Sequence, residues 1–567
     1  MAADDMGHAE DAWWRSAVVY QVYPRSFADS DGDGVGDLDG LTGRLDHLSG
    51  LGVDVLWLSP VNPSPQADNG YDISDYQDID PVFGDLAAFD RLLGAVHERG
   101  MKLVMDLVVN HTSDHHPWFQ DARSSRTSKY RDWYVWCDSP PEDGPEGVVF
   151  PDVEKSVWEY DETTEQYYLH RFYKQQPDLN VANPAVRDEI ARIMGFWTQL
   201  GLSGFRVDAV PFLLETDGQE DADQLPDPHE YLADLRAFLG RRSGDAVLLG
   251  EVNLPYPDTA KFFGDSESSR GDELTMCFDF IGMQQMYLSM TRGEAAPLAA
   301  ALRERPAAPR DAHWATFVRN HDELTLDKLD DDERAEVFAA FGPDKDMQLY
   351  DRGLRRRLPP MVDGDRRRVE LAYSLLFSLP GTPVLFYGEE IGMGENLAAA
   401  GRQAVRTPMQ WTPDKSGGFT AGEGVELPNP VVTGAFGPAK VNAHDQAHDP
   451  ASPLGRMRTL IERYREAPEL AWGDYRVIDA DDPGVLAHLS SLEGGAVLVL
   501  HNVSERSVTA SVEVPGLRGG RLLTDVFTGD TLKSAAAGLV DVPLDPYGYR
   551  WLRVNTPLDD PDRATAV

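Results

Sequence analysis

The sequence predicts an α/β protein: a (β/α)₈ TIM barrel with a small domain inserted after the third strand and a C-terminal antiparallel β-domain. Three observations lead to this fold. Eight short apolar runs alternate with helix-like stretches, polar residues gather at the carboxyl ends of several runs, and closely spaced strands take over after about residue 470. Strands that alternate with helices form a parallel sheet, and eight such units close a barrel.

The eight apolar runs are rich in β-branched residues and have the length of strands. Helical patterns lie between them, and these end in or near glycine, a common helix stop. Four clear ones cover residues 41–52, 86–100, 186–201 and 366–381. The runs are VVYQVYP (18–24), DVLWLSP (54–60), KLVMDLVVN (102–110), GFRVDAV (204–210), AVLLGEVN (246–253), LTMCFDF (274–280), ATFVRNHD (315–322) and PVLFYGEE (383–390).

Polar side chains stand at the carboxyl ends of four of these runs. In a TIM barrel these ends form the rim that carries the active site. Four strands that deliver carboxylates, histidines or arginines to one rim predict a catalytic site rather than four unrelated ion pairs. The residues are Asp106, Asn110 and His111; Arg206 and Asp208; Glu251; and Arg319, His321 and Asp322.

The spacing of the runs also predicts the domain organisation. Residues 112–175, rich in Trp, Tyr, Pro and Asp, form the inserted domain between two parts of the barrel, 1–111 and 176–469. A charged stretch at about 325–365 follows the seventh strand and is expected to act as a lid, since long loops in compact folds are often functional. The β-domain takes up residues 470–567.

Composition excludes several classes of function. The 567 residues carry a formal net charge of −43, which argues against nucleic acid or an anionic membrane as a partner. The two cysteines, Cys137 and Cys277, lie far apart in sequence, so neither a disulfide framework nor a CxxC metal motif is possible. The N-terminus lacks the features of a secretory signal, and no apolar run is long enough to span a membrane, so a cytoplasmic protein is expected.

The run GFRVDAV places two charges where a strand covered on both faces should be apolar. Arg206 and Asp208 are two residues apart, and side chains at this spacing point to the same face of a strand. The two charges are therefore expected to touch. The pair is either structural and neutralised, or it holds a carboxylate at a reaction centre.

The chain resembles the α-amylase superfamily of retaining α-glycosidases and transglycosylases. The resemblance runs from QVYPRSF to the β-domain and includes DLVVNH (106–111), QPDLN (176–180), GFRVDAV, GEVN (250–253), RNHDEL (319–324) and GTPVLFYGEEIGM (381–393). It implies that Asp208 is the nucleophile, which Arg206 would keep ionised. It also implies that Glu251 is the general acid/base and Asp322 the carboxylate that stabilises the transition state. Apolar neighbours of Glu251 suit the partial desolvation that raises a carboxyl pKa.

The resemblance extends to residues that would bind the sugar. His111 and His321 would hydrogen-bond its hydroxyls, while Tyr71 would stack on the non-reducing sugar and Asp68 would bind it. Arg406, in VRTPMQW, would help to close that end of the pocket. The site would then be a blind pocket suited to small saccharides, whereas an endo-acting amylase needs an open cleft.

The loop DSDGDGVGD (29–37) alternates acidic residues with glycines. Oxygen ligands at alternate positions of a tight loop are how proteins cage Ca²⁺, and Mg²⁺ demands stricter octahedral geometry. The loop resembles the single-cation loop of oligosaccharide-acting members of the superfamily. A structural Ca²⁺ is therefore expected, with Mg²⁺ as the alternative. Its ligands would be Asp29, Asp31, Asp33, Asp37 and the backbone carbonyl of Val35.

Within the superfamily, RNHDELTL, RRRLPP and HRFYKQQPDLN most resemble trehalose synthases, which interconvert maltose and trehalose. The alternative is an α-1,4-glucosidase that releases glucose. Ala209, which follows the nucleophile, fits α-1,4 specificity. Val252 departs from the trehalose synthases, which typically carry Ala after the acid/base.

A third interpretation is a non-catalytic, amylase-like scaffold. Such relatives usually lack one of the three carboxylates, all of which are present here. The resemblance leaves the assembly open, including a homo-oligomer.

Overall fold

The computed structural model describes residues 12–140, 148–214, 228–264, 271–554 and 558. Eight parallel strands close into a barrel in the order β1-β14-β10-β9-β8-β7-β3-β2. This confirms the predicted fold, and each predicted run overlaps one barrel strand, although the strands predicted within 315–322 and 383–390 begin two residues and one residue earlier. The strands are β1 (Val19–Val22), β2 (Val55–Leu58), β3 (Lys102–Leu107), β7 (Gly204–Val207), β8 (Val247–Gly250), β9 (Met276–Phe278), β10 (His313–Phe317) and β14 (Thr382–Phe386).

Helices connect and follow the barrel strands. The four helical patterns read from the sequence correspond to α1 with α2, α3, α5 and α13. Apart from the three helices given with the long connections below, the described α-helices up to the end of the barrel region are α1 (Leu38–Thr42), α2 (Leu45–Leu51), α3 (Leu86–Glu98), α5 (Pro184–Leu200), α6 (Val210–Leu214), α7 (Pro228–Gly240), α8 (Tyr256–Thr259), α9 (Phe280–Arg292), α10 (Ala296–Glu304), α13 (Arg366–Ser378), α14 (Ala443–Gln446), α15 (Pro453–Arg465) and α16 (Pro468–Trp472).

Strand register sets the geometry of the rim. Asp106 of β3 lies opposite Arg206 of β7, and Val207 of β7 lies opposite Gly250 of β8. The residues that follow these two strands, Asp208 and Glu251, therefore leave the barrel side by side. Asp208 lies one residue beyond the end of β7 rather than within the strand. Ala209 adopts a left-handed backbone conformation (φ 50°) and turns the chain into α6.

Two long connections stand over the carboxyl ends of the strands. The first, after β3, contains α4 (Pro117–Ala122) and a small antiparallel sheet of β4 (Trp136–Cys137), β6 (Gln166–Leu169) and β5 (Trp158–Asp161). The second, after β10, contains the sheet β11-β13-β12 with α11 and α12. Its elements are β11 (Leu324–Thr325), α11 (Asp331–Phe341), β12 (Gln348–Leu349), β13 (Gly353–Leu354) and α12 (Leu358–Met361).

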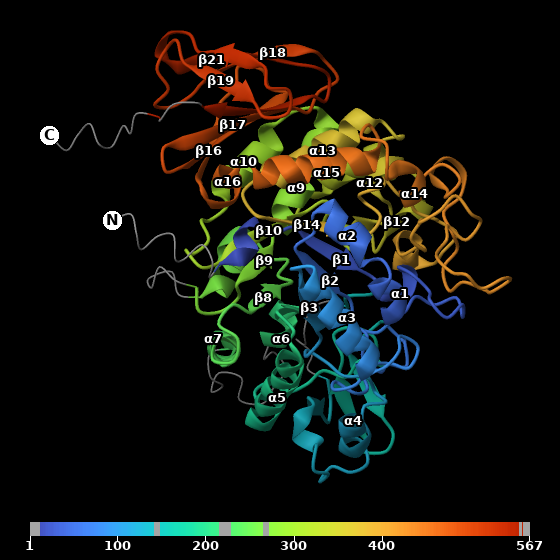
Figure 1. The fold of residues 1–567 in the computed structure, drawn as a ribbon. Coiled ribbons are helices and arrows are strands. Elements are labelled where there is room, and N and C mark those ends of the chain that lie inside the picture. Colours follow the sequence, from blue (N-terminus) through green and yellow to red (C-terminus); the bar gives the residue numbers. More distant parts are fainter. Residues whose placement is uncertain (1–11, 141–147, 215–227, 265–270, 555–557, 559–567) are drawn as a thin grey trace.

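The C-terminal strands form two antiparallel sheets, β15-β16-β17-β22-β19-β20 and β18-β21, at the end of the molecule away from α4 (Figure 1). All five predicted strands are present, and β19, β20 and β21 are additional. The expected boundary at residue 470 falls inside α16. The strands are β15 (Asp474–Ile478), β16 (Val485–Leu492), β17 (Gly495–Asn502), β18 (Val508–Glu513), β19 (Leu522–Asp525), β20 (Thr531–Lys533), β21 (Leu539–Leu544) and β22 (Tyr549–Val554).

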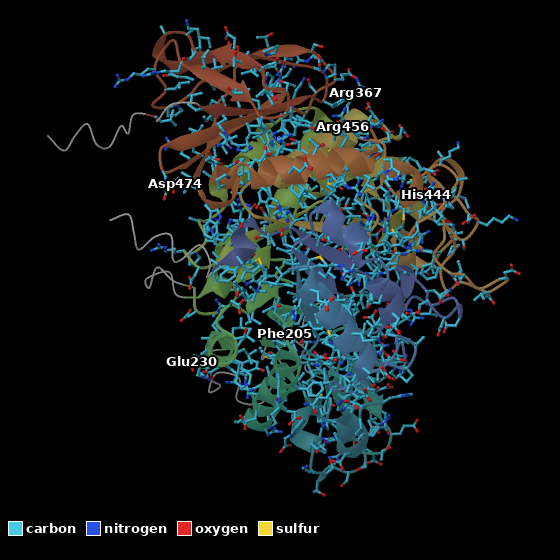
Figure 2. All side chains as sticks on the ribbon, viewed as in Figure 1. Phe205, Glu230, Arg367, His444, Arg456 and Asp474 are labelled. Atoms are coloured by element: carbon cyan, nitrogen blue, oxygen red, sulfur yellow. The ribbon has the colours of Figure 1, made fainter. Side chains whose placement is uncertain are left out.

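Apolar side chains lie in the interior and charged side chains on the outside, as expected for a well-packed protein of this composition. Phe205 of β7 is fully buried, whereas Arg367, Arg456 and Asp474 are exposed on the outside (Figure 2). Within the described residues, no helix combines the length and apolar character that crossing a bilayer requires.

Asp279, which follows β9, shows that a polar residue at a strand end can serve the fold alone. Its carboxylate accepts hydrogen bonds from the Gly282 backbone N–H (2.8 Å) and the Tyr256 hydroxyl (2.9 Å). It also pairs with Arg305 at 2.6 Å, and both side chains are at most 6% exposed. Arg305 in turn donates to the Pro380 carbonyl before β14, so this pair joins three consecutive parts of the barrel.

We expect Asp279→Asn to lower the free energy of unfolding by about 3 kcal/mol, because it leaves the buried Arg305 cation without its counter-charge. The measurement is the shift in the urea unfolding transition. Asp39→Asn is the matched control, since Asp39 pairs with Arg91 on the surface and such pairs contribute roughly 1 kcal/mol or less. Equal losses in the two variants would contradict the assignment.

Candidate active site

The centre of the site is the buried guanidinium of Arg206, which is 1% exposed. Its Nη1 binds Asp106 Oδ1 at 2.6 Å and also pairs with Asp208. Its Nη2 binds Glu251 Oε2 at 2.7 Å. One cation therefore holds three carboxylates from three neighbouring strands, and the two charges noticed in GFRVDAV do touch.

Asp106 is a member of this cluster that the sequence pattern placed at the rim without giving it a role. The indole N–H of Trp57, from β2, donates to Asp106 Oδ2 at 2.8 Å, and the Trp57 ring lies 5.3 Å from the Arg206 guanidinium. Asp106 thus fixes the position of Arg206 from behind. Its place in DLVVNH, at the end of a strand run, was the available signal.

Glu251 has the environment of a general acid. Its Oε2 accepts a hydrogen bond from the Ala209 backbone N–H at 3.2 Å, which ties it to the residue after Asp208. Burial is the main cause that raises the pKa of Glu251 to about 7; the Arg206 charge opposes the shift, and the charge of Asp208 adds to it. The carboxyl group is therefore divided between its protonated and ionised forms near neutral pH.

Asp322 lies in the opposite electrostatic environment. Its Oδ1 binds Arg402 Nη1 and Arg406 Nη2, both at 2.9 Å. Burial acts to raise the pKa of Asp322, but the Arg402 and Arg406 charges outweigh it and hold the pKa below its usual range. Asp322 therefore stays ionised while Glu251 can carry a proton.

Four of the predicted sugar-binding side chains, those of Asp68, Tyr71, His111 and His321, line the same cavity, whereas Arg406 is not among its described lining residues. The ring of Tyr71 stacks on that of His321 with centroids 5.4 Å apart, and the Tyr71 hydroxyl lies 2.8 Å from His321 Nε2. His111 Nε2 lies 3.0 Å from the Tyr71 carbonyl oxygen and 3.0 Å from Gln176 Nε2. Burial lowers the pKa of both histidines, so both are neutral at pH 7.

Asp68 joins this group through Gln176, whose amide donates to Asp68 Oδ2 at 3.1 Å. Burial raises the pKa of Asp68 to about 7, against the charges of Arg402 and Arg406. Arg406 itself binds Asp322 and donates to the His321 carbonyl at 2.8 Å. Its role in the structure is thus to fix the segment that carries Asp322.

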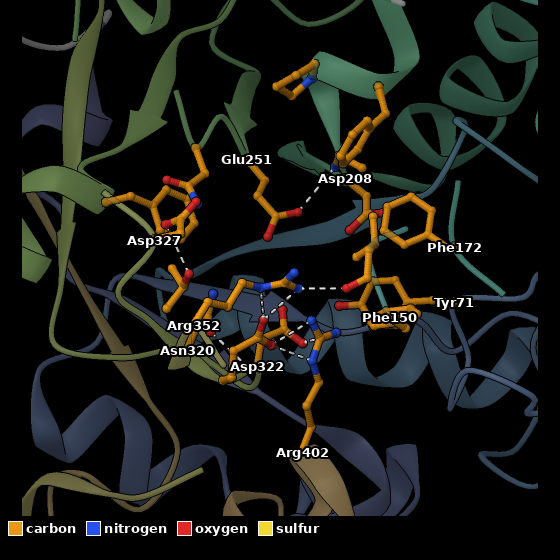
Figure 3. A pocket seen from close by; sticks show the side chains of 18 of the residues that line it. Tyr71, Phe150, Phe172, Asp208, Glu251, Asn320, Asp322, Asp327, Arg352 and Arg402 are labelled. Atoms are coloured by element: carbon orange, nitrogen blue, oxygen red, sulfur yellow. Dashed lines mark hydrogen bonds and ion pairs between the residues drawn. The ribbon is translucent and has the colours of Figure 1, made fainter. Parts of the chain in front are cut away.

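The cavity has a volume of about 370 Å³, within the range of small-molecule sites. Figure 3 shows Asp208 and Glu251 entering it from neighbouring strand ends, with Arg402 reaching Asp322 from another wall. Aromatic and polar residues from the two long connections and from the stretches after β7, β8, β9 and β14 complete the lining, and the sequence motifs assigned a role to none of them. They include Phe150, Phe172, Phe212, Asn253, Phe280, Glu323, Asp327, Lys328, Arg352 and Arg402.

A roof connects three segments above the cavity. Arg352, beside the β12–β13 turn, pairs with Glu323 at 3.1 Å and donates to the Val149 carbonyl at 2.9 Å. The Arg402 guanidinium lies 5.0 Å from the ring of Phe150 and binds Glu323 Oε2 at 2.7 Å. The inserted segment, the stretch after β10 and the stretch after β14 therefore meet over the site.

The acidic loop lies apart from this cavity. Carboxylate oxygens of Asp29, Asp31 and Asp37 come within 4.8 Å of one another. This group does not contain Asp33, whose Oδ1 accepts a hydrogen bond from the Val35 backbone N–H at 2.7 Å.

Comparison with known proteins agrees with this geometry. Residues 21–338 and 355–473 match the family of α-amylase catalytic domains, and residues 494–553 match the sucrose hydrolase-like C-terminal domain. The trehalose synthase/amylase TreS of Mycolicibacterium smegmatis is 40% identical over 517 residues, which cover 88% of this chain and 87% of that protein. The trehalose synthase of Pimelobacter sp. (strain R48) is 38% identical over 557 residues, 97% of either chain.

A solved structure is similar over nearly the same extent. The trehalulose synthase MutB of Pseudomonas mesoacidophila MX-45 has a TM-score of 0.75 and 31% identity, with 96% of this chain and 99% of that chain covered. The matched α-amylase segments make up more than half of the chain and contain Asp208, Glu251 and Asp322. The chain therefore belongs to the α-amylase family of retaining glycosidases and transglucosylases.

Proposed function

We propose that this enzyme interconverts maltose and trehalose by breaking one glucosyl bond and passing the glucosyl unit back to the released glucose. The observation that carries the proposal is the single Arg206 guanidinium that binds both Asp208 and Glu251 at the edge of a roofed cavity. Retaining enzymes hold their two carboxyl groups about 5–5.5 Å apart, and a shared guanidinium keeps such a pair close. The trehalose synthases among the relatives support the choice of reaction.

In the first step, Asp208 attacks the anomeric carbon of the bound glucosyl unit. Glu251 gives its proton to the glycosidic oxygen, the bond to the second glucose breaks, and an ester between Asp208 and the glucosyl unit forms. Asp322, held ionised by its two arginines, stabilises the positive charge that develops on the sugar ring. The neutral His111 and His321 serve as hydrogen-bonding partners for the hydroxyl groups.

In the second step, the released glucose turns within the cavity and presents its anomeric hydroxyl to the ester. Glu251, now ionised, takes the proton of that hydroxyl as the new bond forms and the Asp208 ester breaks. If water takes the place of glucose, the same step yields hydrolysis. The contacts of Arg352 and Arg402 over the cavity favour transfer to glucose, because they restrict the entry of water.

Incubation of the purified protein with maltose tests this proposal directly. We expect trehalose to form faster than free glucose, and maltose to form when trehalose is supplied, because one roofed pocket serves both directions. Chromatographic separation of the three sugars over time is the measurement. Glucose as the sole product would instead identify an α-1,4-glucosidase. If neither trehalose nor glucose formed from maltose, both reactions would be excluded.

Glu251→Gln tests the acid/base assignment and the enzyme class together. We expect the rate on maltose to fall by about 10²–10⁴, because the amide cannot protonate the leaving sugar. With wild type, kcat/KM should decline as the pH rises past about 7, since the acid with a pKa of about 7 loses its proton.

An aryl α-glucoside with a good leaving group serves as the internal control for Glu251→Gln. Its cleavage needs little proton donation, so the first step should be largely retained and its alkaline decline should disappear. Unchanged turnover of maltose by Glu251→Gln would contradict the mechanism and favour a different acid or a different role for the site.

We also propose that the acidic loop binds a structural Ca²⁺ through Asp29, Asp31 and Asp37, with Mg²⁺ as the weaker alternative. The fit rests on the donor set, since three carboxylates that approach one another repel unless a cation lies between them, and carboxylates suit hard cations. The hydrogen bond from the Asp33 backbone N–H has the largest single effect on the pKa of Asp31 and lowers it, but burial and the charges of Asp33, Asp37 and Asp29 together raise this pKa. Asp37 also caps α1, so the loop is joined to the barrel.

Removal of divalent cations with a chelator should lower the melting temperature, and Ca²⁺ should restore it at lower concentration than Mg²⁺. Asp31→Asn should abolish this sensitivity, whereas Asp33→Asn should keep it if only the three carboxylates bind the ion. Loss of sensitivity in both variants would favour the larger ligand set that includes Asp33 and Val35. A melting temperature that changes neither with the chelator nor with added Ca²⁺ would exclude the proposed cation site.

A further inference from the structure

Three consecutive arginines, Arg355, Arg356 and Arg357, follow β13 and all bind one other segment of the chain. That segment, residues 395–406, follows β14 and carries Arg402 and Arg406, the two arginines that bind Asp322. Apart from the 3-10 turn η8 (Gly401–Val405), it has no regular secondary structure. Some backbone hydrogen bonds lie within the segment, such as that from the Asn396 N–H to the Ala404 carbonyl (2.9 Å), and contacts from outside it add to these in placing Arg402 and Arg406.

Arg355 supplies contacts to the first half of segment 395–406. Its Nη2 donates to the Leu397 carbonyl at 2.7 Å, and its Nη1 donates to the carbonyls of Ala399 (2.7 Å) and Gly401 (3.4 Å). Its Nε donates to the Asp346 carbonyl at 2.5 Å, in η7 (Lys345–Met347). One guanidinium thus joins the connection after β10 to the three residues that lead into Arg402.

The next two arginines hold both ends of the segment. Arg356 pairs with Glu395 at 2.6 Å, and the other oxygen of Glu395 accepts the Arg357 backbone N–H at 2.9 Å. The buried Arg357 donates to the Val405 carbonyl through Nε (3.1 Å) and Nη2 (2.8 Å), directly before Arg406. Its Nη1 donates to the Tyr387 carbonyl at 2.8 Å.

Arg319 closes these contacts into a ring. This arginine, 1% exposed, donates to the backbone carbonyls of both Asp322 and Arg356, and to that of Asn320 at 2.9 Å. A path therefore leads from the Asp322 backbone through Arg319 to the arginine triplet, then through segment 395–406 to Arg402 and Arg406. These two return to the Asp322 carboxylate, so its backbone and its side chain are fixed by the same set of contacts.

We propose that Arg355, Arg356 and Arg357 are positioning residues, which place Arg402 and Arg406 on Asp322 by holding segment 395–406. The guanidinium suits this role because it offers five N–H donors in a rigid plane and can bind several carbonyls at once. Lysine keeps the charge but donates from a single flexible point. The proposal rests on the family chemistry of Asp322 and extends it to residues that lie behind the cavity wall.

Arg355→Lys is the direct test, with Glu395→Gln as an independent variant that weakens the hold of Arg356. Both are assayed by release of nitrophenol from p-nitrophenyl α-glucoside, with rates expressed per folded molecule. We expect kcat/KM to fall on the order of ten- to a hundredfold, because displaced catalytic groups lose the reactive geometry. The acid limb of the pH profile should move to higher pH, because Asp322 needs Arg402 and Arg406 close by to stay ionised as the pH falls.

Arg15→Lys is the matched control. Arg15 is also half-buried and donates to two backbone carbonyls, those of Arg310 and Ala312, but it lies at the amino-terminal end of the barrel. This variant should keep the wild-type rate and pH profile. The proposal is overturned if Arg355→Lys and Glu395→Gln also keep both and only melt at lower temperature. A wild-type enzyme that releases nitrophenol but forms no trehalose from maltose would contradict the proposed reaction. The comparison of the variants would still test the positioning role, because it uses nitrophenol release alone.

Discussion

The shared guanidinium of Arg206 is the contact on which the catalytic geometry depends. A buried cation without partners would be strongly unfavourable, and so would three neighbouring carboxylates without a cation. Together they compensate one another, and the barrel register makes the arrangement possible because Asp106 and Arg206 lie on paired positions of β3 and β7. In the proposed mechanism the ion pair is therefore both structural and functional, and the two alternatives raised by GFRVDAV are not exclusive.

The site uses arginines twice, with opposite consequences for the carboxyl groups. Arg206 divides its charge among three acids, so burial dominates at Glu251 and its pKa rises to about 7. Arg402 and Arg406 both direct their charge to one oxygen of Asp322, so attraction dominates there and the pKa falls. Two chemically similar groups thereby acquire different protonation states at one pH, which is what acid catalysis beside a fixed negative charge requires.

The parts that could be predicted from the sequence are those encoded by short patterns. The apolar runs revealed all eight barrel strands, and the motifs at the polar carboxyl ends of some of these runs contain Asp208, Glu251 and Asp322. Arg402, Arg352 and Phe150 could not be found in this way, because they meet only through the packing of segments about 50 to 250 residues apart. The strands β19, β20 and β21 were missed because β19 and β20 have only four and three residues and Pro543 interrupts the alternating pattern of β21.

Residues brought together by packing, rather than by a short motif, also influence whether water or glucose reacts with the glucosyl–Asp208 ester. Val252, where the sequence departs from trehalose synthases, is 1% exposed and lies behind the described residues that line the cavity. The two additional methyl groups of valine compared with alanine can reach the sugar only by moving neighbouring residues. Asn253, next along the chain, does line the cavity, and its amide donates to both oxygens of Asp327 at 3.0 Å. Val252 would therefore influence the reaction through the hydrogen bonds between Asn253 and Asp327. Asp327 belongs to the connection after β10, which also supplies part of the roof.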